Sequence, residues 1–133
     1  MKVLALDYGS ARTGVAVSDP TGTVARPVEV VEQASGEGGL ARIAELVREH
    51  EAERVVVGLP LTMSGEHGRQ AEETETFVAR LREALSIPVE SFDERFTTDL
   101  AEQTGTARGS ATDARAAAHL LSSYLTWSSS APR

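Results

Sequence analysis

A short, uninterrupted run of apolar residues near the middle of the chain limits the fold most. Residues 54–58, Arg-Val-Val-Val-Gly, do not alternate apolar with polar side chains as a strand with one solvent-exposed face would. A continuous apolar run is typical of a central strand that is buried on both sides. The sequence therefore predicts a sheet whose faces are covered by helices.

The patterns on either side of this strand supply the order of the other elements. They predict strands at 3–7, 13–19 and 23–31, helices at 40–50 and 71–85, a strand at 87–92, a short helix at 99–104 and a final helix at 111–124. The main order, βββαβαβα, predicts an α/β fold with a mixed five-stranded sheet and helices on its faces. Pro27 indicates an edge position or an irregularity for the third strand.

The length and hydropathy of the chain indicate one domain that lies outside membranes. With 133 residues the chain can close one core, so we expect a single domain at 1–127 and a disordered tail at 128–133. No apolar run approaches the roughly 20 residues that span a bilayer. The apolar run before Asp7 is too short for a secretory signal. These features predict a cytoplasmic protein.

Cysteine content and net charge restrict the chemistry further. The chain has no cysteine, so thiol catalysis and thiolate metal sites are excluded, and a metal would need oxygen or histidine ligands. The formal net charge of −7 argues against binding nucleic acid over the whole surface. A role on nucleic acid would require local basic patches.

Three carboxylates stand at ends of predicted elements. Asp7 ends the first strand, Glu94 follows the last strand, and Asp113 begins the apolar stripe of the final helix. Each has a structural alternative: Asp7 could cap its turn, Glu94 could form a surface ion pair, and Asp113 could form a capping box with Ser110.

The three carboxylates are more informative as a set. Strand ends and a helix start can meet at one edge of a mixed sheet, where carboxylates without a partner would repel one another. A divalent cation removes this repulsion, and two such ions can hydrolyse a phosphodiester without histidine or cysteine. The set therefore favours a metal-dependent nuclease.

Several ordered motifs across nearly the whole chain resemble one family. They are Leu6-Asp7-Tyr8-Gly9 with Arg12, the stretch 14–19, Ala25-Arg26-Pro27, Val57-Gly58-Leu59-Pro60 with Gly65, Asp93-Glu94-Arg95 before Thr97-Thr98, and Asp113 ahead of an alanine-rich helix. This pattern is similar to the YqgF/RuvX proteins, bacterial RNase H-like proteins described as pre-16S rRNA nucleases or Holliday junction resolvases. The resemblance implies an RNase H-like fold.

The resemblance also implies roles for individual residues. Asp7, Glu94 and Asp113 would bind catalytic Mg²⁺ or Mn²⁺, and the phosphate contacts would come from Arg12, Arg26 and Arg95. The chain departs from the family pattern at Ala11, where a lysine is usual, and at Arg115, where an apolar residue is usual. The first departure weakens the expected phosphate contact, and the second adds a cation on the side of the helix opposite Asp113.

Three functions remain open at this point. The leading hypothesis is a nuclease acting on structured or precursor RNA, with pre-16S rRNA maturation as the role that the resemblance implies. The first alternative is a nuclease that resolves branched DNA, for which a homodimer would be suited to cutting two strands. The second is a non-catalytic ribosome-assembly factor. An actin-like kinase is disfavoured, because such kinases need two related domains around a nucleotide.

Overall fold

The structure is a computed structural model that describes residues 1–9, 11–59, 68–93 and 114–130. Its elements, in chain order, are β1 (Val3–Asp7), β2 (Arg12–Ser18), β3 (Ala25–Glu32), α1 (Glu37–Glu49), β4 (Arg54–Leu59), α2 (Arg69–Ala84), β5 (Val89–Asp93) and α4 (Ala114–Ser130). This order confirms the βββαβαβα prediction.

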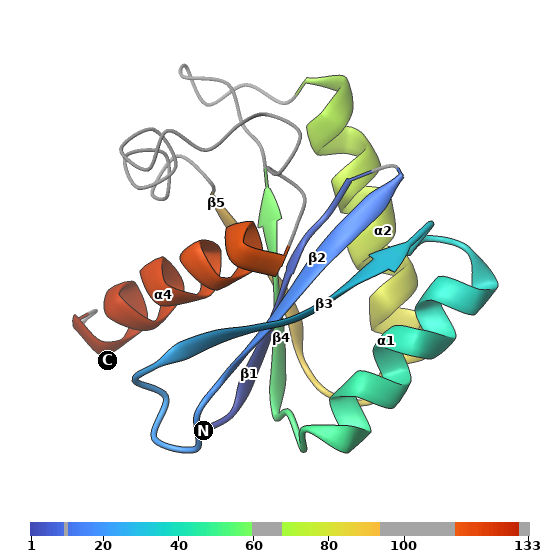
Figure 1. Ribbon diagram of the computed structural model, residues 1–133. Coiled ribbons are helices and arrows are strands. Elements are labelled where there is room, and N and C mark those ends of the chain that lie inside the picture. The colour runs from blue at the N-terminus through green and yellow to red at the C-terminus, as the bar shows by residue number, and fades with distance from the viewer. Residues whose placement is uncertain (10, 60–67, 94–113, 131–133) are drawn as a thin grey trace.

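The five strands form one mixed sheet in the order β3-β2-β1-β4-β5 (Figure 1). The first three strands make an antiparallel meander, and β4 and β5 add parallel to β1. β3 is an edge strand with a bulge opposite Val15 and Ala16, close to Pro27. The bulge and edge position explain how a proline is accommodated there, because a proline cannot donate to the ladder of hydrogen bonds.

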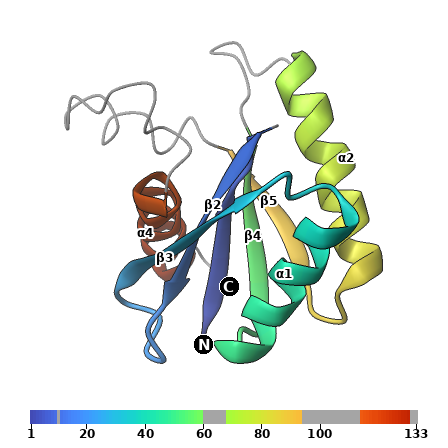
Figure 2. The same ribbon diagram turned by 45° about the vertical axis from the view of Figure 1, so that its right-hand side comes forward.

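Helices cover both faces of the sheet. α1 and α2 lie on one face and α4 on the other, so the sheet is the middle of three layers (Figure 2). The side chains of β1 alternate between the two cores: Leu4 and Leu6 pack toward α1 and α2, whereas Val3 and Ala5 pack toward α4. Since successive residues of a strand point to opposite faces, Asp7 lies on the α4 face.

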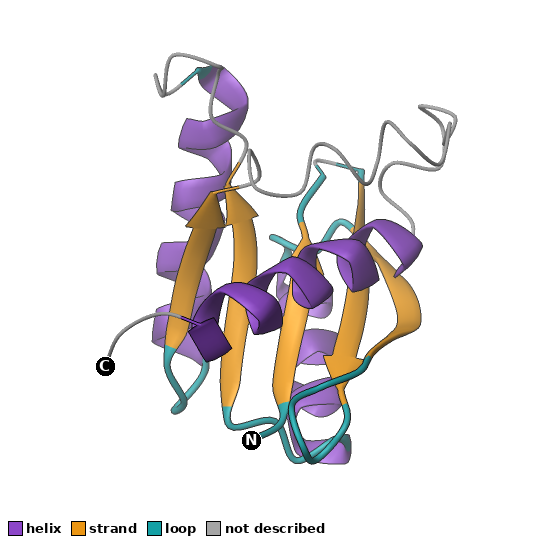
Figure 3. Ribbon diagram, turned by 90° about the vertical axis from the view of Figure 1, so that its left-hand side faces the viewer, coloured by secondary structure: helices purple, strands orange, loops and turns teal. Residues whose placement is uncertain are grey.

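α4 crosses the sheet obliquely, with its first turn over β2 and β3 and its last turns over β4 and β5 (Figure 3). Polar contacts hold the far end of this helix. The Tyr124 hydroxyl donates to Glu90 and accepts a hydrogen bond from Arg54 at 3.2 Å. Burial, together with the hydrogen bond to Glu90, raises the pKa of Tyr124, so its hydroxyl remains a donor. These contacts fix how α4 lies across the sheet.

Some boundaries differ from the sequence prediction. α1 begins at Glu37, earlier than predicted, and includes Gly38 and Gly39; Gly39 packs so closely on Ala34 that a Cβ there would lie 2.5 Å from the alanine backbone. α4 continues through Ser130, although a disordered tail was expected from residue 128. The predicted short helix at 99–104 lies outside the described residues. None of the helices in the described ranges has the length and apolarity of a membrane span.

Asp19 organises the turn between β2 and β3. Its carboxylate accepts hydrogen bonds from the backbone N–H groups of Thr23 and Val24, at 2.8 and 2.9 Å, and from the hydroxyl of Thr21. The chain reverses through Gly22, whose φ of +73° favours glycine. These hydrogen bonds, led by that of Thr21, lower the pKa of Asp19 to about 2.

The turn gives a testable pH dependence. Because the pKa of Asp19 is lowered from 3.8 to about 2 on folding, its contribution to stability is complete above about pH 5 and is lost as the pH falls toward 2. We expect the free energy of unfolding of wild type to exceed that of Asp19→Asn most at neutral pH, and the difference to shrink over this range. Urea unfolding of both proteins at a series of pH values measures it. A difference that stays constant from neutral pH to pH 2 contradicts the assignment.

Candidate active site

The carboxyl ends of three parallel strands meet at one edge of the sheet. β1, β4 and β5 run in the same direction and end at Asp7, Leu59 and Asp93. In open α/β folds ligands bind beyond this edge. Asp7 is half-buried and is the last residue of the central strand β1, so its side chain is held by the best-packed part of the fold.

Glycines flank Asp7 on both sides. Gly14 of β2 is its paired residue. On the other side Leu6 pairs with Val57, so continuing the register by one residue brings Asp7 beside Gly58 of β4. Gly58 in turn pairs with Phe92 of β5, which packs against α4. On both neighbouring strands, the residue beside Asp7 is therefore a glycine, which has no side chain.

Gly14 and Gly58 belong to motifs of the sequence, and the segment from Gly58 to Gly68 could be a substrate loop or a plain connection, but the sequence does not place the two glycines beside Asp7. Glycine weakens a strand interior and frequently marks a place where a ligand or another backbone comes close. Both glycines interrupt runs of β-branched residues, in Thr13-Gly14-Val15 and Val57-Gly58. Only the pairing register shows that the two lie beside the same aspartate.

The other two predicted carboxylates, Glu94 and Asp113, lie outside the described residues. Their chain neighbours are described: Asp93 ends β5 at the Asp7 edge, and Ala114 begins α4 on the Asp7 face. In Figure 3 the first turn of α4 lies toward the end of the sheet where β4 and β5 finish. Among the described residues, no three carboxylates or histidines lie close enough together to hold a metal ion.

The predicted arginines occupy different places. Arg12 is exposed at the start of β2, two residues before Gly14, so it lies on the Asp7 face at the Asp7 edge. Arg26 pairs with Val17 near the start of β3. Because Val17 shares its face with Leu4, Arg26 points to the α1 and α2 side, and it lies toward the opposite end of the sheet. The structure thus brings Arg12 near Asp7 but not Arg26. Arg95 lies outside the described residues.

The helices on the two faces of the sheet differ in their charged residues. The helices that cover the face away from Asp7 carry seven glutamates, partly offset by five arginines. The glutamates are Glu37, Glu45 and Glu49 in α1, and Glu72, Glu73, Glu75 and Glu83 in α2; the arginines are Arg42 and Arg48 in α1, and Arg69, Arg80 and Arg82 in α2. α4, which covers the Asp7 face, contains no aspartate or glutamate and carries Arg115 in its first turn. The helices on the face away from Asp7 thus carry a small net negative charge and α4 a net positive one, so the helix on the Asp7 face adds less repulsion toward a polyanion.

The fold is similar to solved junction-resolving enzymes. RuvC of Thermus thermophilus, in a structure titled as a complex with a Holliday junction substrate, matches with a TM-score of 0.66 and 15% identity over 97% of this chain and 95% of that one. The fowlpox virus resolvase matches with a TM-score of 0.53 and 11% identity, covering 95% of this chain and 97% of that one. At these identities the likeness shows the fold alone, and it confirms the predicted RNase H-like architecture.

Sequence relatives are much closer. A protein of Desulforudis audaxviator named "Putative pre-16S rRNA nuclease" is 39% identical over 94% of this chain and 94% of its own length. A protein of the same name from Chloroflexus aurantiacus is 50% identical over 76% of this chain and 66% of its own length. The family model named RuvX and described as "Holliday junction resolvase" matches residues 1–127. The resemblance found in the sequence motifs is confirmed: the chain belongs to the RuvX (YqgF) family.

Proposed function

We propose that this chain is a metal-dependent nuclease whose active site lies at the Asp7 edge of the sheet. The observation that carries the proposal is the placement of Asp7, which ends the central strand between Gly14 and Gly58 in a chain of the RuvX family. Carboxylate oxygens are the ligands that Mg²⁺ and Mn²⁺ prefer, and the glycines add no side chain of their own beside the carboxylate.

The proposed ligands are Asp7, Glu94 and Asp113. β1 and β5 are separated by β4, so two strand spacings of about 4.8 Å put roughly 10 Å between their backbones. Two ions about 4 Å apart, each about 2.1 Å from its ligands, span roughly 8 Å between ligand oxygens. Side chains from the ends of β1 and β5 that point toward each other can therefore serve one such site, and Asp113, the residue directly before α4, would be the third ligand.

Each part of the chain has a defined task in this proposal. When bound, the metal ions would activate a water molecule and stabilise charge on the scissile phosphate. Asp7 would supply oxygen ligands from a rigid strand, which keeps the site in one geometry. Arg12, exposed on the same face, would contact a neighbouring phosphate and orient the backbone of the substrate.

The proposed substrate is precursor 16S ribosomal RNA, the substrate in the names of the curated relatives. Branched DNA is the second candidate, because the matching family model is described as a Holliday junction resolvase. The two candidates share their chemistry and differ in the shape and sugar that the surface recognises. Resolution of a junction would further require a dimer with two active sites.

Direct comparison of substrates tests the proposal. Purified protein would be incubated with labelled precursor rRNA, a four-way DNA junction and single strands, each in Mg²⁺, Mn²⁺ or EDTA. We expect metal-dependent cleavage of the precursor RNA and none in EDTA. Cleavage of the junction in preference to RNA, by a protein that is dimeric in native mass spectrometry, would favour the second candidate. Cleavage of neither substrate in any metal would contradict the nuclease proposal and leave a non-catalytic assembly factor.

Arg12 and Arg26 form a matched pair for testing the substrate path. Both are exposed arginines on strands, but only Arg12 lies on the Asp7 face at the Asp7 edge. We expect Arg12→Ala to weaken binding of a duplex substrate and to reduce the slope of log K against log salt by about 0.9, the value for one lost phosphate contact. Because Arg26 lies on the other face of the sheet, Arg26→Ala should change this slope less than Arg12→Ala does. Equal changes in both variants would show that the path does not follow the Asp7 face.

A further inference from the structure

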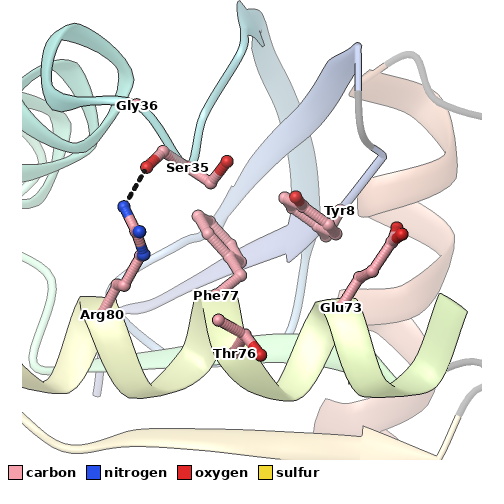
Figure 4. Close-up of a pocket in the computed structure, with 7 residues that line it drawn as sticks. All are labelled: Tyr8, Ser35, Gly36, Glu73, Thr76, Phe77 and Arg80. Carbon is pink, nitrogen blue, oxygen red and sulfur yellow. Dashed lines mark hydrogen bonds between the residues drawn. The ribbon is translucent and has the colours of Figure 1, made fainter. Parts of the chain in front are cut away.

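A cavity of about 280 Å³ lies next to Tyr8, on the face of the sheet that α1 and α2 cover (Figure 4). Its walls come from three segments: Tyr8 after β1, Ser35 before α1, and one side of α2 with Glu73, Phe77 and Arg80. Tyr8 directly follows Asp7, and Ser35 follows β3, which ends beside the start of β2. The cavity therefore lies at the same edge of the sheet as Asp7, but on the face that α1 and α2 cover, whereas Asp7 is on the face that α4 covers.

The walls of this cavity are already held in place. The ring of Tyr8 stacks on that of Phe77, with centroids 4.4 Å apart and an angle of 22° between the planes. Phe77 is fully buried in the core, so it holds Tyr8 in position. At the other end Arg80 donates a hydrogen bond to the carbonyl of Ser35 at 3.0 Å, which joins α2 to the segment before α1 (Figure 4). Little reordering would be needed for a ligand to enter.

The chemistry of the walls selects the kind of ligand. The cavity is lined by one carboxylate and one guanidinium, so its walls carry no net charge. Glu73, half-exposed and paired only loosely with Arg69 at 3.8 Å, can accept hydrogen bonds from N–H groups, whereas Arg80 already donates to the carbonyl of Ser35. Tyr8, half-buried and supported by Phe77, provides an aromatic wall that suits a flat ring. The volume of about 280 Å³ is near the lower end of the roughly 300 to 1,000 Å³ found for pockets that enclose drug-sized ligands, so the cavity fits one ring system. A neutral, flat ring with an amino group meets all three conditions.

We propose that this cavity binds one unpaired base of the nucleic-acid substrate, in the nucleotide next to the cleaved phosphate, and that Glu73 favours a base with an exocyclic amino group. The inference rests on the proposed nuclease function. Since Tyr8 and Asp7 are adjacent in the chain, a nucleotide can keep its phosphate on the Asp7 face while its base turns over the edge of the sheet. A base inside a duplex is stacked and cannot enter, so the cavity selects single-stranded or distorted positions.

Filling the cavity gives the first test. Thr76 lines it and is exposed on α2, whereas Ala79, one turn further, is exposed but does not line it. Thr76→Phe and Ala79→Phe therefore add the same ring to one helix, inside and outside the cavity. The probe is a set of labelled single-stranded RNAs, each with one abasic nucleotide at a different position. Fluorescence anisotropy in Ca²⁺ measures the affinity for each RNA, and gels show whether the RNA is cleaved during the measurement. We expect one position where the abasic nucleotide weakens binding about tenfold in wild type and Ala79→Phe, but not in Thr76→Phe.

The role of Glu73 gives the second test. The RNA position at which an abasic nucleotide weakens binding is filled with cytosine or with uracil. Cytosine carries an amino group on the ring atom where uracil carries a carbonyl oxygen. We expect wild type to bind the cytosine RNA several-fold more tightly than the uracil RNA, and Glu73→Ala to lose this preference. Glu83→Ala removes the same charge from the exposed far end of α2 and should keep the preference.

The outcomes separate this inference from the proposed function. An abasic penalty that is equal in Thr76→Phe and wild type, or that occurs at no position, overturns the base site even when the protein cleaves RNA. A position-specific penalty in a protein that cleaves nothing supports the base site and overturns the nuclease. Failure to bind the RNA at all overturns both. Thermal unfolding of each variant shows whether a loss of binding reflects a loss of folding.

Discussion

Replacing Asp7 by asparagine is expected to lower metal-dependent cleavage by about a thousand-fold or more, because the metal site contributes several kcal/mol of transition-state stabilisation and each 1.36 kcal/mol is a factor of ten. The metal-free variant should be as stable as wild type or more stable, since a carboxylate is removed from a proposed cluster of three. Mn²⁺ should raise the melting temperature of wild type, with a stabilisation near 2.7 kcal/mol at 100 times the dissociation constant, and that of the variant much less.

A structural role for Asp7 predicts the opposite pattern. If its carboxylate only capped the turn after β1, asparagine would cost roughly 0.5 to 2 kcal/mol of stability by analogy with capping residues. It would leave both cleavage and the effect of Mn²⁺ unchanged. Unfolding in urea and initial cleavage rates, measured on the same preparations, distinguish the two accounts.

Replacing Gly58 by valine is expected to lower cleavage about a hundred-fold. The side chain would stand on the Asp7 face next to the carboxylate, where it would displace the ion or the phosphate, and an error of about 1 Å in an active site can cost this much. Gly58 is buried, so the surrounding side chains must accommodate the valine, which can cost about 1 to 3 kcal/mol of stability. Initial rates at saturating Mn²⁺ measure the effect, and the melting temperature reports whether the fold is retained.

Ser91→Val provides the matched control for this substitution. Ser91 is exposed on β5, next to Phe92, and points to the opposite face of the sheet. A valine there should leave cleavage unchanged. A folded Gly58→Val protein that cleaves at the wild-type rate would show that the space beside Asp7 is not part of the active site.

The sheet could be predicted because its signals are local. The apolar run Val55–Val57 marked a central strand, and the helical period of Ala71, Phe77 and Leu81 marked the buried side of α2. The start of α1 was predicted too late because Gly38 and Gly39 read as a loop, whereas close packing of Gly39 on Ala34 favours glycine within the helix. The two residues are close in the sequence, but their contact depends on how the chain turns between β3 and α1, which the composition of this segment does not show.

The site could be predicted only in part for the same reason. Asp7 was identified from its place at the end of a strand, which a sequence can show. The separation of Arg12 from Arg26 depends on the pairing of β2 with β3, in which Arg12 lies opposite Glu32 and Arg26 opposite Val17. The glycines beside Asp7 likewise depend on strand register. The roles of Glu94, Asp113 and Arg95 stay predictions, because these residues lie outside the described part of the chain.

The position of a bound metal tests the central claim most directly. Crystals of the protein grown or soaked in Mn²⁺ would be measured at a wavelength where manganese scatters anomalously. We expect an anomalous peak about 2.1 to 2.2 Å from a carboxylate oxygen of Asp7, with Glu94 and Asp113 as further ligands, and no such peak in Asp7→Asn. Manganese bound elsewhere, with the Asp7 carboxylate bonded only to protein groups, would contradict it.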